Sequence, residues 1–347
     1  MSNGTTRQAV VNLAGLSKND YKGTPSTLCK GCGHNSIVNQ VVQIAFELNI
    51  KPQEIIRLSG IGCSSKSVAY FLGNTFGFNS LHGRMPSIGT GALMANHKLR
   101  GIGVSGDGDT ASIGMGQFKH LMRRNLRMVY VVENNGVYGL TKGQFSATAD
   151  QGQVLKYAGE NQMPPVDICM EAIVSGCGFV ARTFSGDARQ VRELLKAALS
   201  HRGTAVLDII SPCVAFNNHD ASTKSYGYGR EHELPLHELG WVPVEEEIEV
   251  GAYQAGEMRV VEMHDGSHIQ LRKLESDYDP SDRGGALSRL QTAADQREFI
   301  TGLIYYDQSR PSLAELSDLT EMPISQLSPA QLRPKAEALD GVMAELK

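Results

Sequence analysis

The sequence predicts an α/β protein in which a doubly wound parallel sheet is followed by a C-terminal extension. Between residues 35 and 210, short apolar runs alternate with stretches of helical periodicity. Such alternation favours a parallel sheet whose two faces are both covered by helices. The polar motifs fall directly after the apolar runs, where ligands bind in sheets of this kind. A chain of 347 residues is long enough to bury the core that this fold requires.

The predicted elements can be placed in order along the chain. Helices are indicated where apolar residues recur every three or four positions, and strands where a short apolar run is bounded by turn residues. In chain order we expect a helix at Asn35–Leu48, strands at Glu54–Leu58 and Gly101–Ser105, a helix at Ser112–Arg124, a strand at Met128–Glu133, a helix at Val166–Cys177, a strand at Phe179–Thr183, a helix at Ala188–Ser200 and a strand at Ala205–Ile210.

The two ends of the chain are expected to differ from this central domain. Residues 1–22 are polar without clear periodicity and are expected to form an arm. Residues 23–240 are expected to form the α/β domain that holds the chemistry. Past residue 240 the alternation weakens into an acidic run at Glu245–Glu249 and proline-containing stretches. We therefore expect residues 241–347 to be an extension that packs on the domain or on a partner subunit.

Charge and hydropathy exclude several classes of partner. The net charge of -4 and the isoelectric point of 6.2 give no general attraction to nucleic acid or to anionic lipid. No apolar run reaches the length of about 18 residues that a membrane span needs, and no signal-peptide pattern occurs, so we expect a cytoplasmic protein without a membrane partner. The six cysteines are too sparse for a disulfide scaffold, and grouped cysteines in a reducing compartment more often bind metal or do chemistry.

One polar motif has the composition of a diphosphate and magnesium site. Asp107 stands between two glycines directly after the predicted strand at Gly101–Ser105, and Asn135 follows the next strand. Mg²⁺ takes hard oxygen donors, and Asp107, Asn135 and the backbone carbonyl of Val137 offer a carboxylate, an amide and a carbonyl. A helix expected to start near Ala111 would add unpaired N–H groups to the same turn. The motif therefore predicts an anion and metal site.

Two other interpretations of this region were open to the sequence. A Gly-Asp-Gly-Asp string is by itself a common surface turn, and only the second motif at Asn135 favours a site. The glycines at Gly101, Gly103 and Gly106 match the spacing of a dinucleotide fingerprint, but the first two lie inside the predicted strand rather than after it. We therefore reject a nicotinamide-dinucleotide site.

Four of the cysteines are predicted to meet at one edge of the sheet. Cys29 and Cys32 form a CxxC motif before a predicted helix, and Cys63 and Cys213 each follow a predicted strand. Four thiolates suit structural zinc and a [4Fe-4S] cluster equally well. Because Cys63 shares its loop with the expected diphosphate site, electron transfer between neighbours is favoured, and zinc has no redox change to offer.

The other residues of these motifs receive plainer interpretations. Cys169 and Cys177 fall on an apolar stretch and are expected to be buried small side chains. His34, next to the CxxC motif, is read first as a capping or packing residue and second as a ligand. Lone lysines and arginines are usually solvated surface charges.

Taken together, these motifs resemble the thiamine-diphosphate-binding β subunits of 2-oxoacid:ferredoxin oxidoreductases. The resemblance extends over roughly residues 23 to 230, with weaker support from Gly302–Tyr306 and Ser309–Pro311. It implies a fold of the pyrophosphate-domain type. The motifs that carry it are Leu28–His34, Gly60–Lys66, His82–Arg84, Gly106–Asp109, Arg123–Asn125 and Asn134–Gln144.

The resemblance implies a role for each motif. Cys29, Cys32, Cys63 and Cys213 would hold one [4Fe-4S] cluster, and Asp107, Asn135 and Val137 would hold Mg²⁺. Lys66, Arg84 and Lys142 would be cationic residues near the substrate or the phosphates. The residues that would contact thiamine diphosphate are Ile61, Gly62, Cys63, Ser64, His82, Gly108, Asp109, Gly139 and Leu140.

The resemblance also implies an activity and partners. The expected reaction is the coenzyme A-dependent oxidative decarboxylation of a 2-oxoacid, with electrons passed through the cluster to ferredoxin, and it is reversible. We expect 2-oxoglutarate as the substrate, with pyruvate second. Related enzymes activate thiamine with a carboxylate from a second domain, which this sequence does not show. A partner α subunit is therefore expected, in a heterodimer or an α₂β₂ assembly.

Two competing functions share part of this evidence. A subunit of a non-oxidative thiamine-dependent decarboxylase would share the site at Asp107 and Asn135 but would have no use for four cysteines. A zinc-stabilised nucleotide-binding module would use the CxxC motif as a structural site, but it leaves the motif at Asn134–Gln144 unexplained. Iron content distinguishes the oxidoreductase from both of them.

Overall fold

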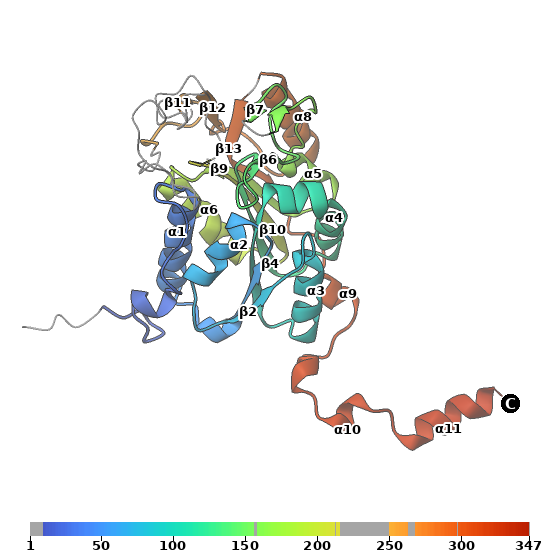
Figure 1. The fold of residues 1–347 in the computed structure, drawn as a ribbon. Helices are drawn as coiled ribbons and strands as arrows, with labels where there is room; N and C mark the ends of the chain where they lie inside the picture. The colour runs from blue at the N-terminus through green and yellow to red at the C-terminus, as the bar shows by residue number, and fades with distance from the viewer. Residues whose placement is uncertain are drawn as a thin grey trace, which may run out of the picture.

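A single mixed sheet forms the centre of the molecule. The computed structural model describes residues 10–155, 158–211, 213–215, 250–262, 268–296 and 298–346. Within these ranges, nine strands form one sheet in the order β11-β12-β13-β9-β10-β4-β3-β1-β2 (Figure 1). Two further sheets are two-stranded hairpins in the loops after β4. They are formed by β5 (Val137–Tyr138) with β6 (Gln144–Phe145) and by β7 (Val154–Leu155) with β8 (Gly159–Glu160).

The strands from β2 to β9 in this order all run parallel. Parallel neighbours need crossover connections, and the helices supply them. Because the strands point the same way, the loops after them lie at one edge of the sheet. Their bounds are β2 Phe76–Asn79, β1 Ile55–Ser59, β3 Arg100–Gly106, β4 Met128–Asn134, β10 Thr204–Ile210 and β9 Phe179–Phe184.

The other three strands come from beyond residue 240. β13 (Glu298–Tyr306) pairs antiparallel with β9, and β12 (His268–Lys273) and β11 (Met258–Glu262) extend the sheet outward from it. Part of the segment expected as an extension therefore completes the central sheet. The physical reason is that β9 would otherwise be a fully buried strand with an unpaired edge, and buried backbone groups need partners.

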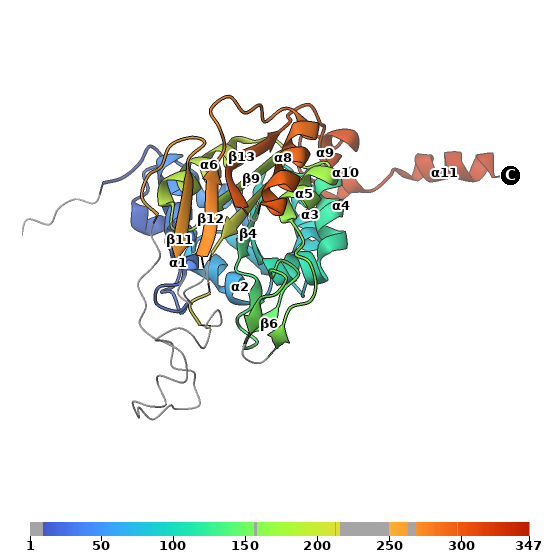
Figure 2. The ribbon, with the colours of Figure 1, turned by 90° about the horizontal axis from the view of Figure 1, so that it is seen from above.

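Helices cover both faces of the sheet. α1 (His34–Glu47) and α6 (Ala188–Ser200) pack on one face, and α3 (Met85–Ala95), α4 (Met115–Arg124), α5 (Ile168–Val174) and α8 (Arg283–Asp295) pack on the other (Figure 2). The side chains of β4 divide accordingly. Val129 and Val131 belong to the core under α1 and α6, whereas Met128, Tyr130 and Val132 belong to the other core. The doubly wound fold predicted from the sequence is confirmed.

Two elements of the sheet and its cover, α3 and β2, were not predicted from the sequence. The α3 segment contains two glycines and is apolar on most sides, so it lacks an amphipathic pattern. β2 is a short edge strand with every residue exposed. Gly103 inside β3 lies so close to Met128 that a Cβ atom would stand 2.4 Å from the methionine Cε. Gly103 is therefore a packing residue, which agrees with the rejection of a dinucleotide fingerprint.

The start of the helix after β3 differs from the expectation. Residues Gly108–Ile113 form a π-helical turn, and α4 begins only at Met115. The cause is a close backbone contact, because a Cβ atom on Gly114 would lie 2.9 Å from the Cα of Gly83. The expected start near Ala111 is therefore wrong, and π turns of this kind often lie at functional sites.

The last part of the chain leaves the body of the molecule. After α9 (Leu313–Leu316), the helices α10 (Pro329–Leu332) and α11 (Ala336–Glu345) form an arm that points away from the sheet in both views (Figures 1 and 2). The described side chains of α10 and α11 are all exposed. Among the described helices, none has the length and apolar character needed to cross a membrane.

Candidate functional site

The sequence motifs meet at the edge of the sheet where the parallel strands end. The turn after β1 leads through Gly62 into α2 (Cys63–Ser67), and it lies against the end of β3. A Cβ atom on Gly106 would stand 3.1 Å from Ser64 Oγ, and one on Gly60 would stand 2.5 Å from Asp109 Oδ2. These glycines let the loops after β1 and β3 approach each other closely.

Asp107 is the most heavily bonded side chain at this edge. Its Oδ2 accepts hydrogen bonds from the Gly136 N–H at 3.0 Å, the Thr148 hydroxyl at 2.6 Å and the Ser146 hydroxyl. Among the described residues, its Oδ1 accepts only one long hydrogen bond, 3.3 Å from the Asn135 N–H. One oxygen is therefore held by the protein, and the other is left with most of its bonding capacity.

The surroundings of Asp107 suit a divalent cation. The side chain is 1% exposed, and burial raises its pKa, which the hydroxyls of Ser146 and Thr148 oppose. No ion pair to Asp107 occurs among the described residues, so a buried carboxylate would stand there without a counter-charge. Asn135 reaches Asp107 through its backbone N–H, and its Oδ1 accepts the Val137 N–H at 3.1 Å. The residues predicted for Mg²⁺ therefore lie next to one another at the ends of β3 and β4, and a buried carboxylate without a counter-charge fits a divalent cation.

Asp109 and Tyr138 fix the glycine-rich turn from two sides. Asp109 Oδ1 accepts the Gly83 N–H at 2.7 Å, and its Oδ2 accepts the Ser105 hydroxyl at 2.9 Å. The Tyr138 hydroxyl donates to the Gly108 carbonyl at 2.9 Å, and a Cβ on Gly108 would strike the tyrosine ring at 2.5 Å. Asp109 therefore holds the turn that carries His82, and His82 itself is exposed.

The remaining predicted contacts of thiamine diphosphate border the same loops. Ile61 and Gly62 are half-buried, and the buried Ser64 hydroxyl reaches the Ile61 carbonyl at 3.4 Å. Gly139 closes a turn through a 3.2 Å hydrogen bond from the Lys142 N–H, and Leu140 within that turn is 51% exposed. Apart from the buried Ser64, these residues lie at the more exposed border of the site.

The charges of the three predicted cationic residues are not paired with carboxylates in the described part of the chain. Lys66 on α2 is half-buried, and Arg84 and Lys142 are exposed. Within the described ranges, none of the three forms an ion pair with a carboxylate, and Arg84 reaches only the Gly83 carbonyl, at 3.4 Å. An anionic ligand would find unpaired positive charge here.

The four thiols predicted to act together influence one another electrostatically. All four are free of disulfides, with Cys32 buried and the others half-buried. Burial raises the pKa of Cys32, and the charges of Glu133, Cys213 and Cys29 raise it further. Burial also raises the pKa of Cys63, where Cys29 is the next cause. Every one of the four is therefore electrostatically coupled to another.

The spacing of these thiols bears on what they can hold. Across the described part of the chain, no three His, Cys, Asp or Glu side chains converge tightly enough for a single metal ion. A [4Fe-4S] cluster is larger, and each thiolate binds its own iron atom at a different corner. The iron or zinc content of the purified protein distinguishes these two kinds of site.

Several residues of this edge escaped the sequence analysis. Ser146 and Thr148 donate to Asp107, and Glu133 lies 1% exposed beside the thiols, where burial raises its pKa well above the usual value. Signals for them did exist. Ser146 and Thr148 are hydroxyl residues at alternate positions, and Glu133 is an acidic residue in an otherwise apolar strand.

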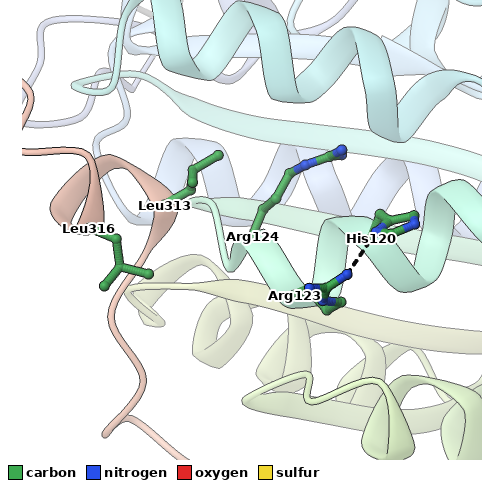
Figure 3. Close-up of a pocket in the computed structure, with 5 residues that line it drawn as sticks. All are labelled: His120, Arg123, Arg124, Leu313 and Leu316. Atoms are coloured by element: carbon green, nitrogen blue, oxygen red, sulfur yellow. Dashed lines mark hydrogen bonds between the residues drawn. The ribbon is translucent and has the colours of Figure 1, made fainter.

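The motif at Arg123–Asn125 lies at the opposite end of α4, away from this edge. Its arginines border a pocket of about 300 Å³ (Figure 3). Asn125 has the left-handed φ of 48°, donates to the Arg310 carbonyl at 2.9 Å and accepts the Thr204 N–H at 3.0 Å. This motif therefore holds the fold together. The pocket is lined by His120, Arg123, Arg124, Leu313 and Leu316.

Comparison with known proteins assigns this arrangement to a family. The family model for the thiamine pyrophosphate enzyme C-terminal TPP binding domain matches residues 60–209. The β subunit of 2-oxoacid:ferredoxin oxidoreductase 1 from Aeropyrum pernix is 39% identical over 220 residues, which cover 63% of this chain and 68% of that protein. The 2-oxoglutarate oxidoreductase subunit KorB of Mycobacterium tuberculosis is 39% identical over 194 residues, covering 55% and 51% of the two chains.

A solved structure matches almost the whole chain. The 2-oxoglutarate:ferredoxin oxidoreductase of Magnetococcus marinus, with 2-oxoglutarate, coenzyme A and succinyl-CoA bound, superposes with a TM-score of 0.71. The sequences are 28% identical, and the match covers 96% of each chain. The likeness therefore includes the strands contributed from beyond residue 240.

Proposed function

Because the chain belongs to the β subunits of the 2-oxoacid:ferredoxin oxidoreductases, we propose that it supplies the cofactor and electron-transfer sites of a 2-oxoglutarate-oxidising enzyme. The enzyme is thiamine-diphosphate-dependent, as the match to the TPP binding domain indicates. The reaction that we propose converts 2-oxoglutarate and coenzyme A to succinyl-CoA and CO₂ and reduces ferredoxin. One observation carries the proposal. The loop that leads to Cys63 packs against the turn that carries Asp107, and Cys63 is itself one of the four coupled thiols.

In this proposal Asp107 and Asn135 hold Mg²⁺ together with the carbonyl of Val137. The hydroxyls of Ser146 and Thr148 keep Asp107 Oδ2 in place, so that Oδ1 faces the cation. Gly106 and Gly108 allow the backbone to approach the diphosphate closely. Thiamine diphosphate supplies an electron sink for cleavage of the bond between the keto carbon and the carboxylate. The chain contributes the orientation and the counter-charge.

Electron transfer is assigned to Cys29, Cys32, Cys63 and Cys213. Burial raises the pKa values of Cys32 and Cys63, and the charges of neighbouring thiols raise them further, so four thiolates without a compensating charge would be unfavourable here. A [4Fe-4S] cluster supplies the positive charge that compensates them and accepts one electron at a time. Because Cys63 directly follows Gly62 of the predicted cofactor loop, a cluster held by Cys63 would adjoin the cofactor site and would supply one-electron transfer to ferredoxin.

Charge favours 2-oxoglutarate as the substrate. 2-Oxoglutarate has a second carboxylate that pyruvate lacks, and Lys66, Arg84 and Lys142 offer cations without an ion-pair partner among the described residues. The relative from Mycobacterium tuberculosis is named for 2-oxoglutarate, and the Magnetococcus marinus enzyme has it bound. Both support the dicarboxylate over pyruvate.

A partner α subunit completes the site in this proposal. The relatives are named β subunits, which implies an enzyme of more than one chain. In the described chain the parallel strands form one sheet, and the carboxylate that activates thiamine is expected from a second domain on the partner. The exposed arm of α10 and α11 extends the surface available to that subunit.

The test is to purify the chain without oxygen, alone and together with its α subunit. We expect about four irons with matching sulfide per β chain, and ferredoxin reduction that needs 2-oxoglutarate, coenzyme A and the α subunit. The same assay with pyruvate should be much slower. Zinc in place of iron, or full activity of the chain alone, would overturn the proposal.

A further inference from the structure

A buried polar group joins the three segments that carry the cysteines. Its centre is Glu133 on β4, where the Ser67 hydroxyl donates to the carboxylate with both oxygens at 2.9 Å. On the other side, His34 Nε2 lies 3.5 Å from Glu133 Oε2. His34 Nδ1 lies 2.7 Å from the Ser211 hydroxyl. We name these four residues, Glu133, Ser67, His34 and Ser211, the Glu133 clamp.

Each outer member of the clamp adjoins a cysteine along the chain. His34 begins α1 directly after the loop that carries Cys29 and Cys32. Ser67 is the last residue of α2, which Cys63 begins, and Ser211 follows β10 and precedes Cys213. Three segments that are distant in the sequence are thus fixed to one carboxyl group, and all four thiols lie on those segments.

A second observation shows how closely the segments are held. Gly33 lies between Cys32 and His34, and a Cβ atom there would stand 2.8 Å from Ser211 Oγ and 2.2 Å from Ser185 Oγ. The CxxC loop therefore lies against the segment of Cys213 at backbone distance. The electrostatic influence of Glu133 on both Cys32 and Cys63 agrees with this arrangement.

Stability of the fold does not explain the clamp. The whole of β4 is buried, and its other side chains from Met128 to Val132 are apolar or aromatic. A carboxyl group in the middle of a sheet costs desolvation energy, and an apolar side chain packed in its place is often neutral or stabilising. A costly group that holds two cysteine-bearing segments directly, and the third through His34, is better explained by the position that it gives those segments.

We propose that the Glu133 clamp positions the three cysteine segments for assembly and retention of the cluster. The four clamp residues are positioning residues, because the hydrogen bonds run between protein segments and not to the thiols. The inference rests on the proposed function, since it presumes that the thiols hold a cluster. Hydrogen bonds behind metal ligands commonly tune affinity by this kind of orientation.

The test compares clamp variants with a matched control on the same strand. Ser67→Ala and Ser211→Ala each remove one buried hydroxyl from the clamp. Thr204→Val removes one buried hydroxyl at the far end of β10, where Thr204 donates to the Leu126 carbonyl at 2.8 Å. Each variant is purified without oxygen as the complex with the α subunit, and the Cys63→Ala complex gives the iron not held by this cluster. Thermal midpoints are measured for all.

The readout is the loss of iron and sulfide to an iron chelator, together with the electron paramagnetic resonance spectrum of the reduced cluster. We expect Ser67→Ala and Ser211→Ala to lose iron about five- to tenfold faster than the wild type, the factor that one buried hydrogen bond supplies. Their spectra should also change. Thr204→Val should lower the thermal midpoint by a similar amount and leave both iron release and the spectrum unchanged.

The outcomes separate the two proposals. Wild-type complex with no more iron than Cys63→Ala overturns the proposed cluster, and the clamp with it. A wild-type cluster with iron release that follows the thermal midpoints of all three variants equally overturns the clamp alone. Should Ser67→Ala or Ser211→Ala prevent folding, Glu133→Gln, which keeps the size and an acceptor for Ser67, is assayed in the same way. Iron retention equal to wild type in that variant, with an unchanged spectrum, also counts against the clamp.

Discussion

The two ends of the parallel sheet both carry polar motifs, but they use them differently. At the end of the strands, Asp107 keeps one oxygen nearly free, and Lys66 has no ion-pair partner among the described residues. At the start of the strands, the Asn125 side chain donates to the Arg310 carbonyl and accepts the Thr204 N–H. A buried polar group with an unused hydrogen-bond acceptor indicates a ligand site, whereas one whose donor and acceptor are both used by the protein indicates a structural role.

From this difference we expect variants at the two ends of the sheet to have different effects. Changes at the ends of β3 and β4 should alter ligand binding more than stability. Changes at the turn after α4 should alter stability without altering binding, because that motif reaches no ligand. The following variants test this difference, and the variant with the largest expected effect comes first.

Replacing Arg182 should lower both stability and binding, because this buried cation is connected to the end of the strands through Asp208 and Asn134. Arg182 is 4% exposed and donates to Asp208 and Asp167, each at 2.8 Å. Asp208 in turn accepts the Asn134 side-chain N–H at 2.9 Å. Arg182→Met leaves two carboxylates without their cation, and we expect a loss of about 3–5 kcal/mol in the free energy of unfolding, measured by urea titration. Thiamine diphosphate binding should weaken as well.

The matched control for that variant is Arg272→Met. Arg272 pairs with Glu298 through two hydrogen bonds, but its side chain is 27% exposed. This pair is only partly buried, since the Glu298 side chain is 7% exposed and that of Arg272 is 27% exposed. We therefore expect Arg272→Met to cost about 1 kcal/mol, less than Arg182→Met. Equal losses for Arg182→Met and Arg272→Met would show that burial of the triad has no special weight.

Asn125→Ala should cost stability without touching the site. The Thr204 N–H would lose its acceptor inside the protein, and alanine would have to adopt a φ of 48°. Together these effects should lower the free energy of unfolding by about 2 kcal/mol. Asn125→Gly, which removes the backbone strain but not the lost hydrogen bonds, should cost less. Weaker thiamine diphosphate binding by either variant, measured by calorimetry, would contradict the structural assignment.

The fold could be predicted from the sequence where burial leaves a pattern. β4 and α6 were found because a fully buried strand is an apolar run and a half-buried helix repeats its apolar residues. The strands β11 to β13 were missed, since they follow a segment without alternation and belong to the sheet only through pairing with β9. Pairing between distant strands is a tertiary fact that local sequence does not carry.

The candidate site was predicted in part, and the difference has the same origin. Asp107 and Asn135 stand directly after strands, so parallel topology alone brings them together. Ser146 reaches Asp107 only because the hairpin of β5 and β6 folds back over it. Glu133 had a visible signal as an acidic residue in an apolar strand, but its partners come from three other segments.

Thr148→Val tests whether Asp107 is held as its hydrogen bonds indicate. The Thr148 hydroxyl lies 2.6 Å from Asp107 Oδ2 and 2.9 Å from Asn134 Oδ1. Valine keeps the shape and removes the donor, so we expect the affinity for Mg²⁺ and thiamine diphosphate to fall about tenfold, as for other groups behind metal ligands. Thr148→Ser keeps the hydroxyl and should bind almost normally in calorimetric titrations. Equal affinities for the two variants would refute this role for the hydroxyl.

The smallest effect is expected at His201, near the start of β10 and far from the site. His201 is 3% exposed, lies 5.8 Å from the ring centroids of both Phe179 and Tyr306, and has no hydrogen-bond partner for either ring nitrogen within the described chain. Burial lowers its pKa from 6.5, which the charge of Asp307 opposes. The unfolded chain therefore binds a proton more readily than the folded one, so stability is present above 6.5 and is lost as the pH falls below it.

His201→Phe should remove this part of the pH dependence. The phenyl ring fills a similar space between the two aromatic neighbours and cannot take up a proton. The fall in thermal midpoint between about pH 7 and about pH 5 should therefore be smaller in the variant than in the wild type, by the share that one histidine contributes. His120→Phe, at an exposed position on α4, is the matched control and should leave the slope unchanged. An unchanged slope in His201→Phe would mean that the buried ring accepts a proton in the folded state as easily as in the unfolded one, and it would contradict the expected cost of an unpaired charge at the start of the strands.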